Sequence, residues 1–263
     1  MKYLVILLIG MLLSMNVPLN SYSAGEYSVY DSLKLRHATN PNICLFEVDP
    51  SLYDDWDSLR NITIIAINEW IIKLEYVYPN GDWGVDIKII PWEDHETAIP
   101  DDYHECNIMI NYEKTSGDTS LGNTSLNFNK SWHKYMFINI FLESQKSITK
   151  IIIGGNNTSV EQDSMNIPLS LNTIKNIVIH ELGHGFGLGH YDTGRLQNQM
   201  MSYTKSVMIP SISPFDEHQI LSVTYLDLVM VSKIYGENGW GKSQPVFHID
   251  GCNILHTFVF KCF

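Results

Sequence analysis

The sequence predicts an α+β fold, in which short strands and longer helices share one folded body. Three observations predict this class. The 263-residue chain is 44% hydrophobic and 17% charged, which is ordinary for a globular protein. Several short segments are apolar or alternate between apolar and polar residues, as strands do. Longer segments have the apolar periodicity or the capping residues of helices.

Five segments are predicted as strands. They span residues 42–48, 85–89, 106–112, 121–128 and 135–142. The fourth is polar and suits the edge of a sheet, whereas the fifth is apolar enough for the interior.

Three helices are predicted. The first spans 54–77, where apolar residues recur at intervals of three and four. A loop rich in Gly, Asn and Ser is predicted over 154–166, before a second helix that begins with Ser170 or Asn172 as its cap. The third helix spans 222–235 and ends at a glycine.

The chain begins with the pattern of a signal peptide. Lys2 precedes an apolar run that ends at Leu13, and small residues lie near Ala24. The run is shorter than the ~20 residues that a membrane-spanning helix needs, although an uncleaved anchor is the alternative. We therefore expect residues 1–24 to be removed and the protein to be secreted.

The formal net charge of −12 makes nucleic acid an unsuitable partner. An acidic surface repels phosphate groups, and no basic cluster in the sequence overrides this repulsion.

The four cysteines can form disulfides, because the chain is expected in an oxidising compartment. Three pairings are open to them, and proximity in sequence favours Cys252–Cys262 and Cys44–Cys106.

The strongest chemical signal is a histidine pattern at residues 180–190. His180 and His184 are four residues apart, so on a helix both can present ring nitrogens to one metal ion. His190 cannot lie on the same helical face. The helix must therefore end before it, and Gly187 is the natural position because glycine adopts the left-handed conformation without strain.

Three histidine ligands predict a catalytic zinc ion, because one coordination position stays open for water. Glu181 follows the first ligand and is expected to act as the general base for that water in peptide-bond hydrolysis. An ordinary helix is the alternative. It is disfavoured because Gly183 and Gly185 each destabilise a helix by ~1 kcal/mol relative to alanine.

The extended histidine pattern resembles that of the metzincin metalloproteases, and Met208 followed by Pro210 is similar to the methionine turn of their matrixin branch. The resemblance covers most of the chain. It implies a zincin-like catalytic domain with a twisted, mixed, mostly parallel five-stranded sheet and three helices. It also implies that Met208 and Gly187 form the floor of the site.

The resemblance further implies how a substrate is bound. Residues 119–123 would lie on an edge strand that pairs with an extended peptide, so Leu121 and Gly122 are expected substrate-binding residues. Pro210 is expected in the wall of the specificity pocket, where Ile209 replaces the usual tyrosine.

Other features depart from the matrixin pattern. Tyr191 follows the third histidine, and the sequence has neither a cysteine-switch segment nor a His-x-Asp cluster that matches the family's second, structural zinc site. Cys44 as a zinc ligand in a latent form is an alternative. Calcium is left open because Asp118 and Asp163 lie in predicted loops.

Together these observations predict a secreted, monomeric zinc metalloendopeptidase that acts on proteins or peptides. The expected domains are a signal peptide (1–24), a short N-terminal segment (25–41), a catalytic domain (42–237) and a cysteine-containing tail (238–263). The alternatives are a binding or adhesion module that retains zinc, and a processing factor that acts on a single partner.

Overall fold

The computed structural model describes most of the chain from His37 onward. The described residues are 37–92, 105–115, 120–128, 134–154, 157–190, 206–209, 212–214, 216, 218–241, 247–249, 252–255 and 259–262. The predicted signal peptide lies outside them. Within the described residues no helix is both long and apolar enough to span a membrane.

The centre of the fold is a mixed sheet of five strands in the order β2-β1-β3-β5-β4. The strands are β1 (Asn42–Phe46), β2 (Asp86–Ile90), β3 (Ile108–Glu113), β4 (Gly122–Phe128) and β5 (Lys134–Phe141). Neighbouring strands are parallel except for β4, which runs antiparallel to β5 at the edge. All five predicted strands, and the edge position of the polar one, are confirmed.

The described residues form three helices, which confirms the predicted number and positions. They are α2 (Trp56–Val77), α3 (Leu171–Gly185) and α4 (Tyr225–Tyr235). Each begins where a polar side chain accepts a hydrogen bond from a backbone N–H of the first turn; the capping residues are Asp55, Ser170 and Thr224. The two candidate caps for α3 are thus resolved in favour of Ser170.

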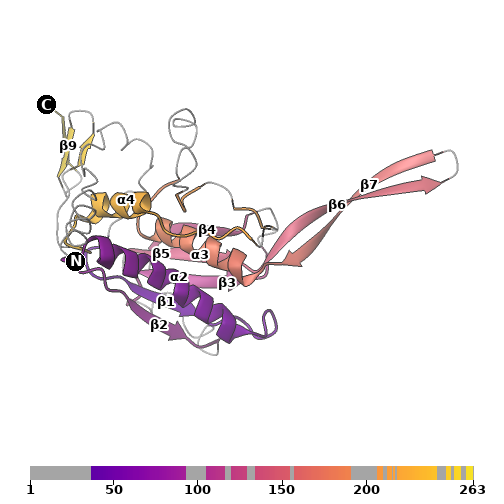
Figure 1. The fold of residues 1–263 in the computed structure, drawn as a ribbon, viewed down its shortest axis with the longest axis horizontal. Helices are drawn as coiled ribbons and strands as arrows, with labels where there is room; N and C mark the ends of the chain where they lie inside the picture. Colours follow the sequence, from indigo (N-terminus) through magenta and orange to yellow (C-terminus); the bar gives the residue numbers. More distant parts are fainter. Residues whose placement is uncertain are drawn as a thin grey trace, which may run out of the picture.

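Helices α2 and α3 lie on one face of the sheet and pack against each other (Figure 1). The inward-facing residues of β1, β3 and β5 form the main core with these helices, and α4 adds its apolar face to it. The indole of Trp70 in α2 donates a hydrogen bond to the carbonyl oxygen of Ile179 in α3 at 3.0 Å. This packing fixes the position of α3, which carries the histidine pattern.

A long hairpin separates the sheet from α3. Strands β6 (Glu143–Gly154) and β7 (Asn157–Pro168) pair only with each other in the described residues and extend away from the body (Figure 1). The predicted loop over 154–166 is therefore wrong. A ribbon that covers no core needs no apolar face, so its polar sequence resembled that of a loop.

The predicted bond between Cys44 and Cys106 is confirmed. It excludes the alternative in which Cys44 binds zinc, because a disulfide sulfur is no longer a thiolate ligand. In the tail, β8 (Phe247–Ile249), β9 (Cys252–Leu255) and β10 (Val259–Cys262) form a small sheet. Its register places Cys252 opposite Cys262, and the bond between them stays a prediction.

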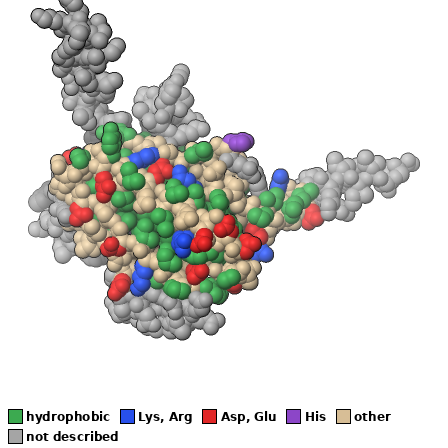
Figure 2. Space-filling view, turned by 60° about the horizontal axis from the view of Figure 1, so that its bottom comes forward, with side chains coloured by type: hydrophobic (Ala, Val, Ile, Leu, Met, Phe, Trp, Pro, Cys, Tyr) green, Lys and Arg blue, Asp and Glu red, His purple; other side chains and the backbone are tan. Residues whose placement is uncertain are grey.

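Figure 2 shows one face of the molecule, on which acidic and basic side chains are interspersed. Among the described side chains of that face, the basic ones are not gathered into one patch. The expectation that nucleic acid is not a partner rests on the net charge and stays a prediction.

Candidate metal centre

The site is built on the second half of α3. This half is buried between the sheet and α2, so its residues have fixed neighbours. His180 and His184 are only 6% and 9% exposed and lie one helical turn apart.

The end of α3 brings the third histidine to the other two. Gly187 has a φ of +94°, and its N–H donates to the carbonyl oxygen of His184 at 2.8 Å. The next N–H, from Leu188, donates to the carbonyl oxygen of Gly183 at 2.9 Å. These two bonds define a Schellman motif, which needs a left-handed residue at the position of Gly187. The chain thus turns after α3 and returns His190, as predicted.

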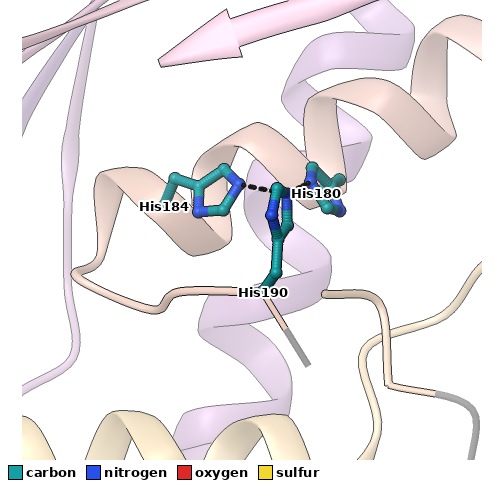
Figure 3. Close-up of side chains that lie close together, drawn as sticks. All are labelled: His180, His184 and His190. Carbon is teal, nitrogen blue, oxygen red and sulfur yellow. Dashed lines mark hydrogen bonds between the residues drawn. The ribbon is translucent and has the colours of Figure 1, made fainter. Parts of the chain in front are cut away.

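The three imidazole rings converge through their Nε2 atoms (Figure 3). The Nε2 of His190 lies 3.3 Å from the Nε2 of His180 and 3.3 Å from that of His184. The Nδ1 of His180 faces the carbonyl oxygen of Val207 at 2.8 Å, and that of His184 faces the carbonyl oxygen of Leu188 at 2.7 Å.

These contacts determine the tautomers. A carbonyl oxygen only accepts hydrogen bonds, so both Nδ1 atoms must carry the proton and donate it. In neutral His180 and His184 the Nε2 atoms are then bare acceptors. Both point at His190, whose own Nε2 has at most one proton to offer. A cation at the centre of the three nitrogens satisfies all of them at once.

The spacing fits zinc. Tetrahedral zinc binds histidine nitrogen at ~2.0–2.1 Å, which places two ligand nitrogens about 3.3–3.4 Å apart. The candidate ligand atoms all lie within 4.8 Å of one another. The donor set, the spacing and the carbonyl oxygens behind two of the rings are therefore compatible with zinc binding.

Burial favours the neutral form of His180 and His184, which is the form that can bind a metal ion. Burial is the main cause that lowers the pKa of His180 to about 4, and the neighbouring His184 lowers it further. Burial also lowers the pKa of His184. Both rings are therefore neutral near pH 7, as metal binding requires.

Glu181 follows His180 in α3 and is buried, with 6% of its surface exposed. Its carboxylate oxygen Oε2 accepts a hydrogen bond of 2.6 Å from Oγ1 of Thr124 in β4. Burial raises the pKa of Glu181 to about 7, and the hydrogen bond from Thr124 partly opposes this rise. A cation held by the histidines would lower this pKa, because it favours the carboxylate.

The segment below α3 contains the predicted methionine. Met208 is fully buried, and its sulfur lies so close to α3 that a Cβ at Gly183 would overlap it. The carboxylate of Asp227 in α4 accepts hydrogen bonds from Ser206 and from the N–H of Val207. It thereby holds the backbone whose carbonyl oxygen orients His180.

The predicted substrate-binding residues fall into two groups. Leu121 and Gly122 lie at the start of the edge strand β4, and Gly122 is close to Glu181. Pro210 lies outside the described residues. Of the aspartates considered for calcium, Asp118 also lies outside them, and Asp163 lies in β7 rather than in a loop.

Two residues near the site have no local signal in the sequence. Thr124 is 57 residues from Glu181, and His37 is 148 residues from Gly185, whose carbonyl oxygen lies 2.8 Å from the Nε2 of His37. Trp240, from the predicted tail, packs against Tyr235 and edge-on to His37. Only the fold brings these residues to the last turn of α3.

The geometry agrees with a comparison with known protein families. A family model described as Peptidase M66 matches residues 139–227, from β5 through the hairpin and α3 to the beginning of α4. A comparison with curated protein sequences found no match. The matched third of the chain contains all three histidines and Glu181, and its similarity to Peptidase M66 indicates a metallopeptidase family.

Proposed function

We propose that the chain is a secreted, zinc-dependent endopeptidase of the metzincin type, close to the matrixins in its methionine turn. His180, His184 and His190 bind one zinc ion, and Glu181 is the general base. The observation that carries the proposal is the convergence of three Nε2 atoms beside a buried carboxylate. The match to a metallopeptidase family supports it.

Bound zinc supplies a Lewis acid that polarises a peptide carbonyl group and makes water more acidic. Glu181 takes a proton from the attacking water and later gives it to the nitrogen of the leaving amine. The carbonyl oxygens of Val207 and Leu188 keep two ligand rings in one orientation throughout. No acyl-enzyme forms, because water is the nucleophile.

The edge of the sheet supplies a place for the substrate. Strand β4 pairs with β5 on one side, and no other described strand pairs with it. An extended peptide can add to such an edge by backbone hydrogen bonds. We propose that it does so along Leu121 and Gly122, next to Glu181, with Pro210 in the wall of the adjoining pocket.

The first test uses the purified mature chain, residues 25–263, with a library of short peptides. We expect one equivalent of zinc, measured by elemental analysis, and cleavage that a chelator abolishes and added zinc restores. Glu181→Gln should keep zinc and the melting temperature but lower kcat by roughly 100-fold or more. His190→Ala should lose zinc affinity, because two histidines leave the ion with too few ligands.

Each outcome of this test assigns a different function. Unchanged turnover by Glu181→Gln would disprove the proposed base. A wild-type chain that binds zinc and cleaves neither the peptides nor a denatured protein would instead be a binding or adhesion module. A processing factor for a single partner would cleave that partner but neither the peptides nor the denatured protein, and loss of residues 242–263, which keeps the buried Trp240 in place, would abolish this cleavage.

Secretion is a separate proposal. The Cys44–Cys106 disulfide supports it, because such bonds persist in oxidising compartments. Mass spectrometry of the protein recovered from culture medium should show a new N-terminus at Gly25. Recovery of the intact chain from the membrane fraction would favour the uncleaved anchor.

A further inference from the structure

The edge strand β4 touches the proposed general base directly. Thr124 is the third residue of β4, and its hydroxyl donates the 2.6 Å hydrogen bond to Oε2 of Glu181. The same hydroxyl lies 3.3 Å from the backbone carbonyl oxygen of Glu181. In the described part of the chain, this is the one side-chain hydrogen bond found for that carboxylate.

Gly122 bounds the other carboxylate oxygen. It lies two residues before Thr124 and so faces the same side of the strand. A Cβ at Gly122 would come within 2.9 Å of Oε1 of Glu181 and 2.8 Å of Cγ2 of Ile177. The missing side chain of Gly122 therefore leaves space beside Oε1 of Glu181, whereas the hydroxyl of Thr124 holds Oε2 by a hydrogen bond.

We propose that Thr124 is a positioning residue for Glu181: its hydroxyl fixes the rotamer in which the carboxylate is ready for proton transfer. This inference rests on the proposed function. It adds that the strand proposed to receive the substrate also orients the base. Substrate alignment and proton transfer then depend on the same three residues of β4, from Gly122 to Thr124.

The test compares two substitutions at one position. Thr124→Val keeps the branched shape and removes the hydroxyl, whereas Thr124→Ser keeps the hydroxyl. We expect Thr124→Val to lower kcat for a short peptide by about 10- to 100-fold, with KM changed by less than about threefold, because a misplaced group slows the chemical step. Thr124→Ser should recover most of the lost kcat.

The matched control is the next residue along the strand. Ser125 is exposed, and its position in β4 alternates with that of Thr124. Ser125→Val also places a valine in β4 but leaves the contact with Glu181 intact. It should keep the wild-type kcat, and all three variants should bind one equivalent of zinc.

A second measurement needs no activity. In the zinc-free protein, urea denaturation of wild type, Thr124→Val, Glu181→Ala and the double variant forms a double-mutant cycle. We expect Thr124→Val to lower the denaturation midpoint less in the Glu181→Ala background than in wild type, because the partner is already absent. Additive shifts would show that the hydrogen bond does not exist in solution.

The outcomes separate the two proposals. If wild type cleaves peptides and Thr124→Val matches its kcat, the positioning role is disproved while the proposed function stands. Equal damage by Thr124→Ser and Thr124→Val would also disprove it, because shape and not the hydroxyl would then matter. A wild type that cleaves nothing would overturn the proposed function itself.

Discussion

The two glycines that flank His184 have different physical reasons to be there. Gly183 faces Met208, and a Cβ at this position would overlap the methionine sulfur inside the buried floor. A Cβ at Gly185 would lie 3.4 Å from Ile108 and 3.5 Å from Ile138, which is ordinary contact. Only Gly183 is therefore required by the packing around the site.

This difference gives a matched pair of substitutions. Gly183→Ala should lower the free energy of unfolding by about 1–3 kcal/mol through overpacking. It should also weaken zinc binding, because a displaced Met208 would shift the preceding residue, Val207, whose carbonyl oxygen orients the ring of His180. Gly185→Ala should be neutral or raise that free energy by up to ~1 kcal/mol through helix propensity. Urea denaturation and competitive zinc titration measure both quantities. Similar results for the two variants would contradict the packing argument.

At this scale, the sequence predicted what depends on spacing along one segment. The pairing of His180 with His184 follows from their four-residue spacing on α3, and the turn at Gly187 follows from the need to bring His190 back to them. Thr124 could not be predicted, because its contact with Glu181 depends on how an edge strand lies over a helix far away in the sequence. The roles of Leu121, Gly122 and Pro210 stay predictions.

Between elements, a polar cluster fastens α2 and α3 to the segment before α4. Glu69 in α2 accepts hydrogen bonds from Lys175 in α3 at 2.7 Å and from Ser222 at 2.7 Å. Lys73 in α2 adds a bond to the same carboxylate at 2.9 Å. Burial alone would raise the pKa of Glu69, but these hydrogen bonds outweigh it and lower the pKa to about 2.

The lowered pKa predicts how stability depends on acid. The unfolded chain takes up a proton at Glu69 near pH 4.3, roughly, whereas the folded protein resists it until about pH 2. The stabilisation is therefore complete above about pH 5 and is lost as the pH falls towards 2. Glu69→Gln should unfold more easily at pH 7, by about 1–3 kcal/mol, and should show a flatter stability profile in that window.

The control is an ion pair of the same helix. Asp57 and Arg60 form a 2.9 Å pair in which the aspartate side chain is 77% exposed. Asp57→Asn should leave stability almost unchanged at each pH, since exposed pairs are screened by water. Urea denaturation between pH 2 and pH 7 compares the variants. Parallel profiles for wild type and Glu69→Gln would exclude the proposed role of the cluster.

The success of element prediction depended on burial. Four strands of the sheet (β1, β2, β3 and β5) and the three helices have faces that pack against the core, and this packing imposes the apolar patterns that were recognised. Strand β7 has no such constraint, so its Asn- and Ser-containing sequence indicated a loop. The mixed, mostly parallel character of the sheet was implied by the family resemblance, whereas the order of the strands was not predicted, because no pattern within a strand identifies its neighbours.

Over the whole molecule, the two faces of the sheet are stabilised differently. The face towards α2 and α3 forms the large core, whereas Cys44, Cys106, Ile90 and Met109 form a small cluster on the opposite face. The disulfide in this cluster joins positions 62 residues apart. It thus restricts the unfolded chain over a long loop and reinforces the face that has few apolar contacts.

Replacing both Cys44 and Cys106 with alanine should therefore lower the free energy of unfolding by about 2–4 kcal/mol. Zinc affinity of the folded fraction should not change, because the histidines lie on the other face of the sheet. Denaturation of the zinc-free variant and zinc titration below its unfolding range test these statements. If the variant without the disulfide were as stable as wild type, the apolar contacts of the small cluster would be enough to stabilise that face of the sheet.

The hairpin of β6 and β7 leaves the body and returns to it at one point, where the N–H of Leu169 donates to the carbonyl oxygen of Leu142 at 2.9 Å. The residues between Leu142 and Leu169 therefore form an insertion between β5 and α3 whose two ends lie next to each other. Its length and sequence can consequently change in evolution without moving either element. Descendants of this protein could diversify at the ribbon while inheriting the histidine centre intact.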